Sequence, residues 1–308
     1  MDIDLITNVL YAMVRTGTPL LIVALGEMVC EKSGVLNLGQ EGMMLMGAVI
    51  GFIVALTTGS LVLGFILAIG AGILMSMLFA AIALGLSANQ VATGLALTIF
   101  GTGLSAFIGA SYVGQPITGL EPLAIPLLSE IPVIGKMLFA QDVVVYLSFA
   151  LFALVYWFFK SSRSGLTVKA VGENPHAATA IGLPVMRTRY LAIAFGGAMA
   201  GLAGGYLSLA YTPLWAENMT AGRGWIALAL VVFATWRAER ILLGAYLFGL
   251  ASILNLVAQG LGYPVSPNIL AMMPYAATVV VLVMLSSNVV KSRMHTPMSL
   301  GKTYHSHG

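Results

Sequence analysis

Charged residues are scarce in this 308-residue chain. Asp, Glu, Lys and Arg together make up 8% of the sequence, whereas hydrophobic residues make up 59%. A soluble domain carries about 25% charged residues to keep its surface hydrated. Residues 42–120 contain none, and about 20 apolar residues suffice for one helical membrane crossing. The composition excludes a soluble enzyme, a nucleic-acid-binding protein and a disordered chain. It predicts an all-α polytopic protein embedded in a lipid bilayer.

Cysteine and histidine are also rare. Cys30 is the single cysteine, and three of the four histidines lie near the C-terminus. One cysteine excludes an intrachain disulfide and a cysteine-based metal cluster. The chain lacks the GxSxG, HExxH and CxxC motifs. Gly301-Lys302-Thr303 is not a P-loop, because Thr296 stands where that motif needs glycine. These absences predict no catalytic residue, no metal site and no cofactor bound by this chain.

Apolar blocks separated by glycine, proline and charge predict about ten crossings within a single transmembrane domain, 1–308. The first two blocks and the eighth are short, which is typical of tilted, interrupted or partly re-entrant segments. The ten blocks are 3–15, 17–31, 34–56, 60–85, 90–110, 143–160, 190–211, 224–237, 241–261 and 269–289.

The distribution of Lys and Arg predicts the orientation. With both termini cytoplasmic, only Arg15, Lys136 and Arg223 of the 14 basic residues lie outside. This is the bias expected from the positive-inside rule. It makes 111–142 an outer loop, 161–189 an inner loop and 290–308 a cytoplasmic tail.

The two loops differ in content. Four prolines interrupt any helix through 111–142, although residues 131–139 suit a short helix at the membrane interface. The inner loop is the most charged segment of the chain.

Small residues recur every four positions on three predicted helices, which favours close helix packing over a pore lining. The three sets are Gly101, Ser105 and Gly109; Gly197, Gly201 and Gly205; and Gly64, Ala68 and Gly72.

Polar side chains interrupt the apolar sequence at 26–47. Glu27, Asn37, Gln40 and Glu41 are candidates for the path of a transported solute, since carboxylates at membrane depth tend to face a cavity or a partner. If a helix begins near Gly34, Glu41 lies about 10 Å along it. The alternative is a capping and salt-bridging turn at the cytoplasmic interface.

Two further polar positions allow a structural and a functional interpretation. Asn89 and Gln90 open the fifth predicted crossing and are either a helix cap or part of the solute path. Gly222-Arg223-Gly224 precedes an apolar helix, where Arg223 and Trp225 either anchor an interfacial turn or contact solute.

The inner loop contains one well-marked short helix. Asn174 suits its N-cap, Pro175 its first turn and Gly182 its end. Two turns are too short to be stable alone. The helix must therefore pack on the ends of neighbouring helices or in a groove of a partner protein.

Four segments, in order, resemble ABC-importer permeases of the nucleoside and simple-sugar type. They are GEMVCEKSGVLNLGQEGMMLMGA, IPVIGKMLFAQD, KAVGENPHAATAIG and NMTAGRGWIALALV. The resemblance covers about residues 17–290, and the chain looks like the shorter of the two dissimilar permeases in systems with a basic-membrane-protein-type receptor. Many relatives have proline and glycine soon after the last segment, whereas this chain has Trp236-Arg237-Ala238-Glu239-Arg240.

The resemblance implies a type II importer-like fold in a bacterial plasma membrane, without enzymatic activity of its own. It implies three partners: a second permease subunit, a cytoplasmic ATPase that uses ATP and Mg, and an external substrate-binding lipoprotein. It assigns contact with the ATPase to Gly172, Glu173, Asn174, Pro175, Ala177, Ala178 and Gly182. The expected solute is a nucleoside. The alternatives are a simple sugar, a flavin-like vitamin, or an ion-coupled transporter that uses Glu27 and Glu41.

Overall fold

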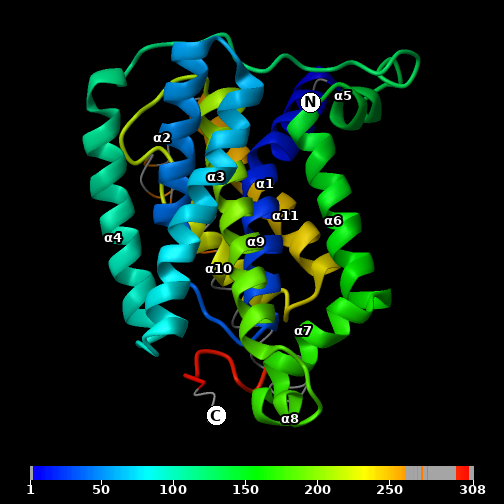
Figure 1. Cartoon of the computed structure of the whole chain (residues 1–308). Helices are drawn as coiled ribbons and strands as arrows, with labels where there is room; N and C mark the ends of the chain where they lie inside the picture. The colour runs from blue at the N-terminus through cyan, green and yellow to red at the C-terminus, as the bar shows by residue number, and fades with distance from the viewer. Residues whose placement is uncertain are drawn as a thin grey trace.

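The computed structural model describes residues 3–260 and 296–304, together with Ser266, Ile269, Met272 and Ala276. Its regular structure is helical, with a bundle of long helices standing side by side (Figure 1). The α-helices are α1 (Ile3–Lys32), α2 (Gln40–Thr58), α3 (Leu61–Ala80), α4 (Gln90–Gly109), α5 (Ile134–Phe139), α6 (Val143–Ser161), α7 (Arg163–Glu173), α8 (Pro175–Ala180), α9 (Val185–Tyr206), α10 (Arg223–Phe233) and α11 (Ala238–Gly260). Single π-helical turns extend α3 to Gly85 and α9 to Tyr211.

Seven helices within these residues are long and apolar enough to cross a membrane. The centre of the bundle is formed by α1, α2 and α9, whose residues are mostly buried. Large side chains on α3, α4 and α6 point outward, including Leu74, Ile99, Phe107 and Trp157. Exposed apolar side chains on outer helices suit contact with lipid.

The first two predicted crossings are one helix, which corrects the expected count of ten. Helix α1 continues for 30 residues through Pro19, a length of about 45 Å. A proline inside a helix leaves the carbonyl four residues earlier without its N–H partner. Here that carbonyl belongs to Arg15, and the Tyr206 hydroxyl donates to it at 3.4 Å. A distant side chain therefore contacts the carbonyl that Pro19 leaves without its N–H partner, and the break predicted at residue 16 is absent.

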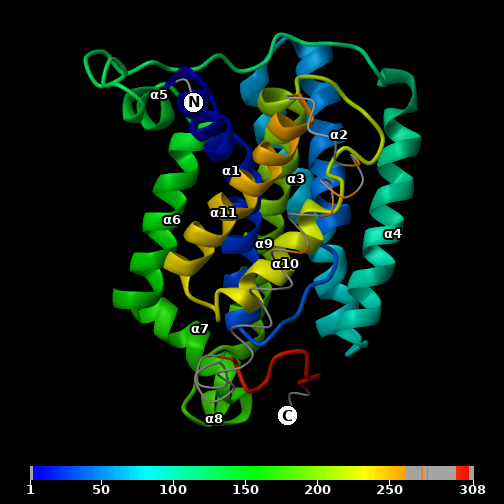
Figure 2. The same cartoon turned by 180° about the vertical axis from the view of Figure 1, so that it is seen from behind.

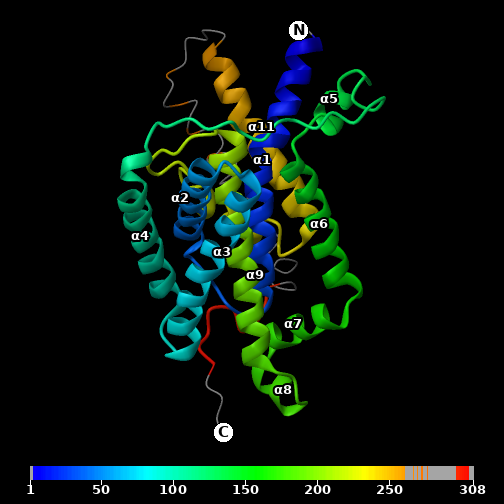
Figure 3. The ribbon, with the colours of Figure 1, turned by 45° about the horizontal axis from the view of Figure 1, so that its top comes forward.

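The single α1 also corrects the prediction that both termini share one side. The N-terminus and residues 296–304 lie at opposite ends of the bundle (Figures 1 and 3). Helix α5 lies beside the N-terminal end of α1, where Lys136 Nζ donates to Asn8 Oδ1 at 2.7 Å. The short helix predicted within 131–139 is confirmed as α5.

Two other predicted crossings also change. Residues 34–39 are not helical, and α2 begins at Gln40, so Glu41 lies in the first helical turn instead of about 10 Å along. The eighth block forms only the 11-residue α10, as its short length indicated. The predicted crossing 269–289 lies outside the described residues, apart from three isolated positions.

The small-residue faces pack helices tightly, as predicted. A Cβ atom added to Gly101 of α4 would lie 2.7 Å from the Gly42 Cα atom of α2. Gly201 of α9 lies in the same way against Ala68 and Gly72 of α3. Close backbone approach of this kind holds membrane helices together without a hydrophobic driving force between them.

Candidate functional site

The buried polar side chains near the start of α2 hold the irregular segment 33–39 in place. The Glu27 carboxylate on α1 accepts from the Asn37 backbone N at 3.1 Å and from Gln40 Nε2 at 2.5 Å. The Asn37 side chain accepts from Gly39 N at 2.9 Å, which explains the late start of the helix. All three predicted path residues are fully buried. Their described contacts are within the chain, and contact with solute remains a prediction.

Glu41 connects α2 to the half-length helix α10. Its carboxylate accepts from Thr220 Oγ1 at 2.5 Å, Gly222 N at 2.7 Å and Gly224 N at 2.6 Å. The first N–H groups of a helix lack partners within the helix, and the helix dipole favours negative charge there. The Glu41 carboxylate gives these N–H groups an acceptor and also places a negative charge at the start of α10. From the back of the molecule, segment 212–222 runs from the end of α9 toward the middle of the bundle, where α10 begins (Figure 2).

The other end of α10 is also anchored on α1. Trp236 follows the helix and donates its indole N–H to Glu31 Oε2 at 2.5 Å. This tryptophan lies in the stretch that departs from the pattern of many relatives.

Asn89 and Gln90 have distinct structural contacts. Asn89 Oδ1 caps α4 by accepting from Ala92 N at 3.0 Å. Gln90 Oε1 accepts from Leu36 N at 2.8 Å, and its Nε2 donates to the Lys302 carbonyl at 3.3 Å. Gln90 therefore connects α4 with both the 33–39 segment and the C-terminal segment.

The inner loop forms a pair of short helices that projects from one end of the bundle (Figure 1). The α7 helix was not predicted, whereas α8 begins and ends as expected. Asn174 Oδ1 accepts from Ala177 N at 3.0 Å, Pro175 opens the helix, and Gly182 has a left-handed φ of 82° just beyond it. Glu173, Asn174, Ala177 and Gly182 are exposed.

The remaining predicted coupling residues face inward. Gly172, Pro175 and Ala178 are buried, and Ala178 packs in a small apolar cluster with Val171, Val185 and Tyr304. Four of the predicted coupling residues are therefore exposed, and three attach the helix pair to the bundle. Contact with an ATPase stays a prediction.

Residues 296–304 fasten this helix pair to the bundle. Ser299 donates through both its N–H and its hydroxyl to the Gly172 carbonyl, at 3.0 and 2.5 Å. The Tyr304 hydroxyl lies 2.7 Å from Thr179 Oγ1, and Gly301 N donates to the Gly34 carbonyl at 3.3 Å. The segment therefore joins α7, α8 and the turn after α1. The sequence contained no motif for this attachment.

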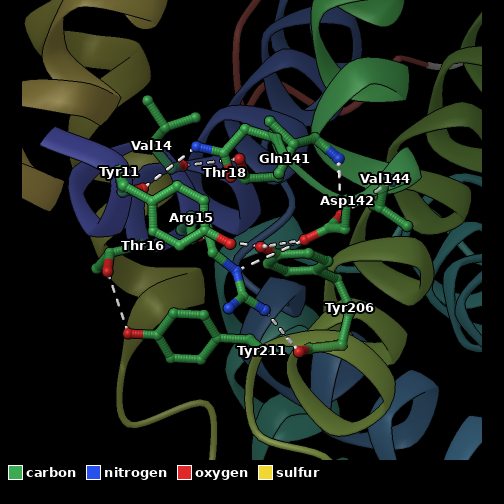
Figure 4. Close-up of polar contacts among 12 residues, drawn as sticks. Tyr11, Val14, Arg15, Thr16, Thr18, Gln141, Asp142, Val144, Tyr206 and Tyr211 are labelled. Atoms are coloured by element: carbon green, nitrogen blue, oxygen red, sulfur yellow. Dashed lines mark hydrogen bonds and ion pairs between the residues drawn. The ribbon is translucent and has the colours of Figure 1, made fainter. Parts of the chain in front are cut away.

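A second polar network lies toward the N-terminal end of α1 and was also missed (Figure 4). Arg15 Nη2 donates to the Ala210 carbonyl at 2.8 Å, and Arg15 Nε lies 3.6 Å from Asp142 Oδ2. Asp142 also caps α6 through the Val144 and Val145 amides, both at 3.0 Å. Burial raises the pKa of the Asp142 carboxyl, opposed by these amides and by Arg15. The sequence prediction placed Arg15 between two crossings, which hid its position within a helix.

Comparison with known proteins identifies the family to which the chain belongs. A family model described as "Branched-chain amino acid transport system / permease component" matches residues 9–286. The chain belongs to this permease family.

Similar proteins along nearly the full length are also ABC transporter permeases. The chain is 40% identical to the putative glucose ABC transporter permease TsgC13 of Haloferax volcanii, covering 96% of this chain and 97% of that protein. It is 33% identical to the guanosine ABC transporter permease NupQ of Bacillus subtilis, covering 92% and 93%. It is 29% identical to the nucleoside ABC transporter permease NupC of Lactococcus lactis, covering 86% and 88%.

These relatives confirm the predicted resemblance to nucleoside and simple-sugar permeases. The chain is a multi-pass membrane component of an ABC importer. It is the permease component and not the catalytic subunit. The printed names of its relatives divide between glucose and nucleosides, so membership of the family leaves the solute open.

Proposed function

We propose that this permease forms the gate of an ATP-driven importer of nucleosides. A second permease subunit, a cytoplasmic ATPase that uses ATP and Mg, and an external substrate-binding lipoprotein complete the assembly in the plasma membrane. The observation that carries the proposal is the projecting α7–α8 pair. Residues 296–304 attach this pair to the turn after α1, and the 33–39 segment continues from that turn into α2 and Glu41.

The contacts support a route by which ATPase movement reaches the gate. The exposed surface around Glu173 and Ala177 receives the ATPase. Movement of α8 reaches residues 296–304 through the contact between Thr179 and Tyr304. Movement of α7 passes through Ser299 and Gly301 to the turn after α1, because these residues hydrogen-bond to Gly172 and Gly34. The 33–39 segment then moves the start of α2. Glu41 transmits this displacement to α10, which opens and closes the path.

This route requires α7 and α8 to lie in the cytoplasm. Residues 296–304 then lie on the cytoplasmic side, while the N-terminal end of α1 and the loop 111–142 lie outside. Basic residues of the inner loop remain on the inner side, as the positive-inside rule favours.

A simple sugar is the second candidate solute, because the relative TsgC13 is 40% identical and carries a glucose name. Nucleosides and sugars both present a ring with several hydroxyl groups. A flavin-like vitamin has no support among the named relatives. An ion-coupled mechanism would need Glu27 and Glu41 to take up ions, yet both carboxylates accept several hydrogen bonds within the chain.

Uptake by the complete assembly in sealed vesicles tests the proposal. We expect accumulation of guanosine when ATP is supplied on the ATPase side, and we expect it to continue when an ionophore collapses the ion gradients. Glucose is measured in parallel. Undiminished uptake by this chain without the ATPase, or uptake that stops with an uncoupler while ATP stays high, would contradict the proposal.

A further inference from the structure

Two half-buried guanidinium groups converge on one aromatic ring beside α10. The Arg15 Cζ atom lies 6.0 Å from the centre of the Tyr211 ring, and the Arg223 Cζ atom lies 5.9 Å from the same centre. The two charged carbons are therefore no more than about 12 Å apart. Arg15 comes from α1, Tyr211 from the last turn of the α9 extension and Arg223 from the first turn of α10. Figure 4 shows Arg15 and Tyr211 side by side within the polar network.

The described structure uses only part of the hydrogen-bonding capacity of these groups. Arg15 Nη2 donates to the Ala210 carbonyl, but Nε lies 3.6 Å from Asp142 and makes no hydrogen bond within the described residues. Arg223 Nη1 donates to the carbonyls of Met219 and Thr220, at 3.2 and 3.1 Å. A guanidinium group has five N–H donors in a fixed plane. Each arginine therefore retains donors, and the Arg15 side chain is 23% exposed.

Two carboxylates lie close to this site in the fold. Asp142 is the carboxylate that pairs with Arg15, and Glu41 is occupied by the amides of α10. Cations at membrane depth are rare unless they pair or face a water-filled cavity, and they commonly mark solute pathways.

The adjoining backbone is irregular and partly exposed. Residues 212–222 lack regular helix between α9 and α10, and Glu217, Asn218 and Ala221 are exposed. Irregular backbone at membrane depth is tolerated where it is buried in protein or lines a water-filled space. The exposed residues of this segment suit the water-filled path that the transport function requires.

We propose that Arg15, Tyr211 and Arg223 form a solute-contact site in the translocation path. The two guanidinium groups donate to hydroxyl or carbonyl oxygens of a neutral, ring-bearing solute, and the Tyr211 ring packs against the ring of the solute. Guanidinium forks and aromatic faces match both the sugar and the base of a nucleoside, and a simple sugar shares the hydroxyl chemistry. This inference rests on the proposed transport function and adds the residues that recognise the solute.

Transport kinetics of the complete assembly in vesicles test the site, with guanosine and glucose as separate probes. Arg223→Gln and Arg15→Gln should each raise the KM of the transported probe about ten-fold or more, as expected for loss of hydrogen bonds from a charged donor. ATP hydrolysis without solute should remain. The matched control is Arg240→Gln, because the Arg240 guanidinium donates to Thr235 Oγ1 beyond the other end of α10. Its KM should stay at the wild-type value.

An accessibility measurement keeps the test decisive if the arginine variants fail to assemble. Thr212 is exposed beside Tyr211, and the native Cys30 is buried. In Thr212→Cys, saturating solute should slow thiol labelling several-fold, whereas labelling of Glu121→Cys in the outer loop should not change. Unchanged KM values in assembled arginine variants, or equal labelling of Thr212→Cys with and without solute, would overturn the site. Absence of ATP-driven uptake by the wild-type assembly would instead overturn the transport function itself.

Discussion

The Glu41 carboxylate accepts a hydrogen bond from the Gly224 backbone N at 2.6 Å, across 183 residues of sequence. This contact joins the first turn of α2 to the first turn of α10. Together with the bonds from Thr220 and Gly222, it fixes the beginning of a helix that starts inside the bundle. The buried acid is therefore the point at which α2 and α10 meet.

Replacing Glu41 should impair transport more than assembly. In Glu41→Ala the α10 amides lose a buried acceptor, and leaving such groups unsatisfied costs about 1–3 kcal/mol. We expect a lower melting temperature and a large loss of ATP-driven uptake, while copurification with the ATPase continues. Glu121→Ala, at an exposed outer-loop position, is the control. Unaltered uptake kinetics in Glu41→Ala would leave Glu41 with a structural role only.

Glu173 should control association with the ATPase. The side chain is exposed at the end of α7, so Glu173→Lys reverses a surface charge without disturbing the core. We expect normal insertion of the permease and loss of copurified ATPase. Glu130→Lys makes the same change in the exposed outer loop and should retain the ATPase. Normal amounts of ATPase with Glu173→Lys would count against this docking surface.

Substitutions at Ala177 and Ala178 should distinguish a loss of ATPase docking from a loss of local folding. Ala177 is exposed, whereas Ala178 is 2% exposed within the cluster around Tyr304. Ala177→Asp should weaken ATPase binding while α8 stays folded. Ala178→Asp buries an unpaired carboxylate and should unfold α8 as well. Hydrogen exchange over residues 172–183 distinguishes the two variants, and equal protection in both would contradict the assignment.

The C-terminal segment should be needed for coupling. Tyr304→Ala removes a ring from the apolar cluster and the hydroxyl contact with Thr179. We expect the assembly to retain its ATPase and to hydrolyse ATP, but to move several-fold less solute for each ATP. Tyr304→Phe, which keeps the ring, should have the smaller effect. An unchanged ratio of transport to hydrolysis in Tyr304→Ala would show that the segment transmits no movement.

Two glycines of α4 offer a matched test of helix packing. Gly101 approaches Gly42, whereas a Cβ atom added to Gly103 would meet no atom within 4 Å. Both substitutions to leucine raise helix propensity equally. Gly101→Leu should therefore separate α2 from α4 and lower thermal stability, while Gly103→Leu should be neutral or slightly stabilising. Similar melting temperatures for the two variants would contradict the close approach.

Local sequence signals predicted much of the fold. The capping pattern at Asn174, Pro175 and Gly182 depends on neighbouring residues, and α8 has those bounds. The small-residue faces depend on helical periodicity and also pack as predicted. The predicted break at residue 16 was wrong, because α1 continues from the block 3–15 into the block 17–31 and its Arg15 carbonyl accepts from the Tyr206 hydroxyl of α9. The error in one helix also accounts for the wrong prediction that both termini share one side, since the N-terminus and residues 296–304 lie at opposite ends of the bundle.

The candidate sites were harder to predict because their partners are distant in sequence. Glu41 was identified as unusual, but the sequence did not reveal that α10 would surround it. Arg15 seemed to be a loop residue, so its proximity to Tyr211 and Asp142 was hidden. The attachment of Ser299 to Gly172 spans 127 residues and has no motif. Single residues were visible in the sequence, whereas the contacts that give them a role were not.

Site-specific labelling at Glu173 tests the central claim most directly. Glu173→Cys adds one exposed thiol to a chain whose native cysteine is buried. In sealed right-side-out vesicles, a membrane-impermeant reagent should leave this thiol unmodified. After the inner face is opened, the thiol should react, and bound ATPase should protect it. Labelling from the outside in sealed vesicles, or full reactivity with the ATPase bound, would contradict a gate driven through α7 and α8.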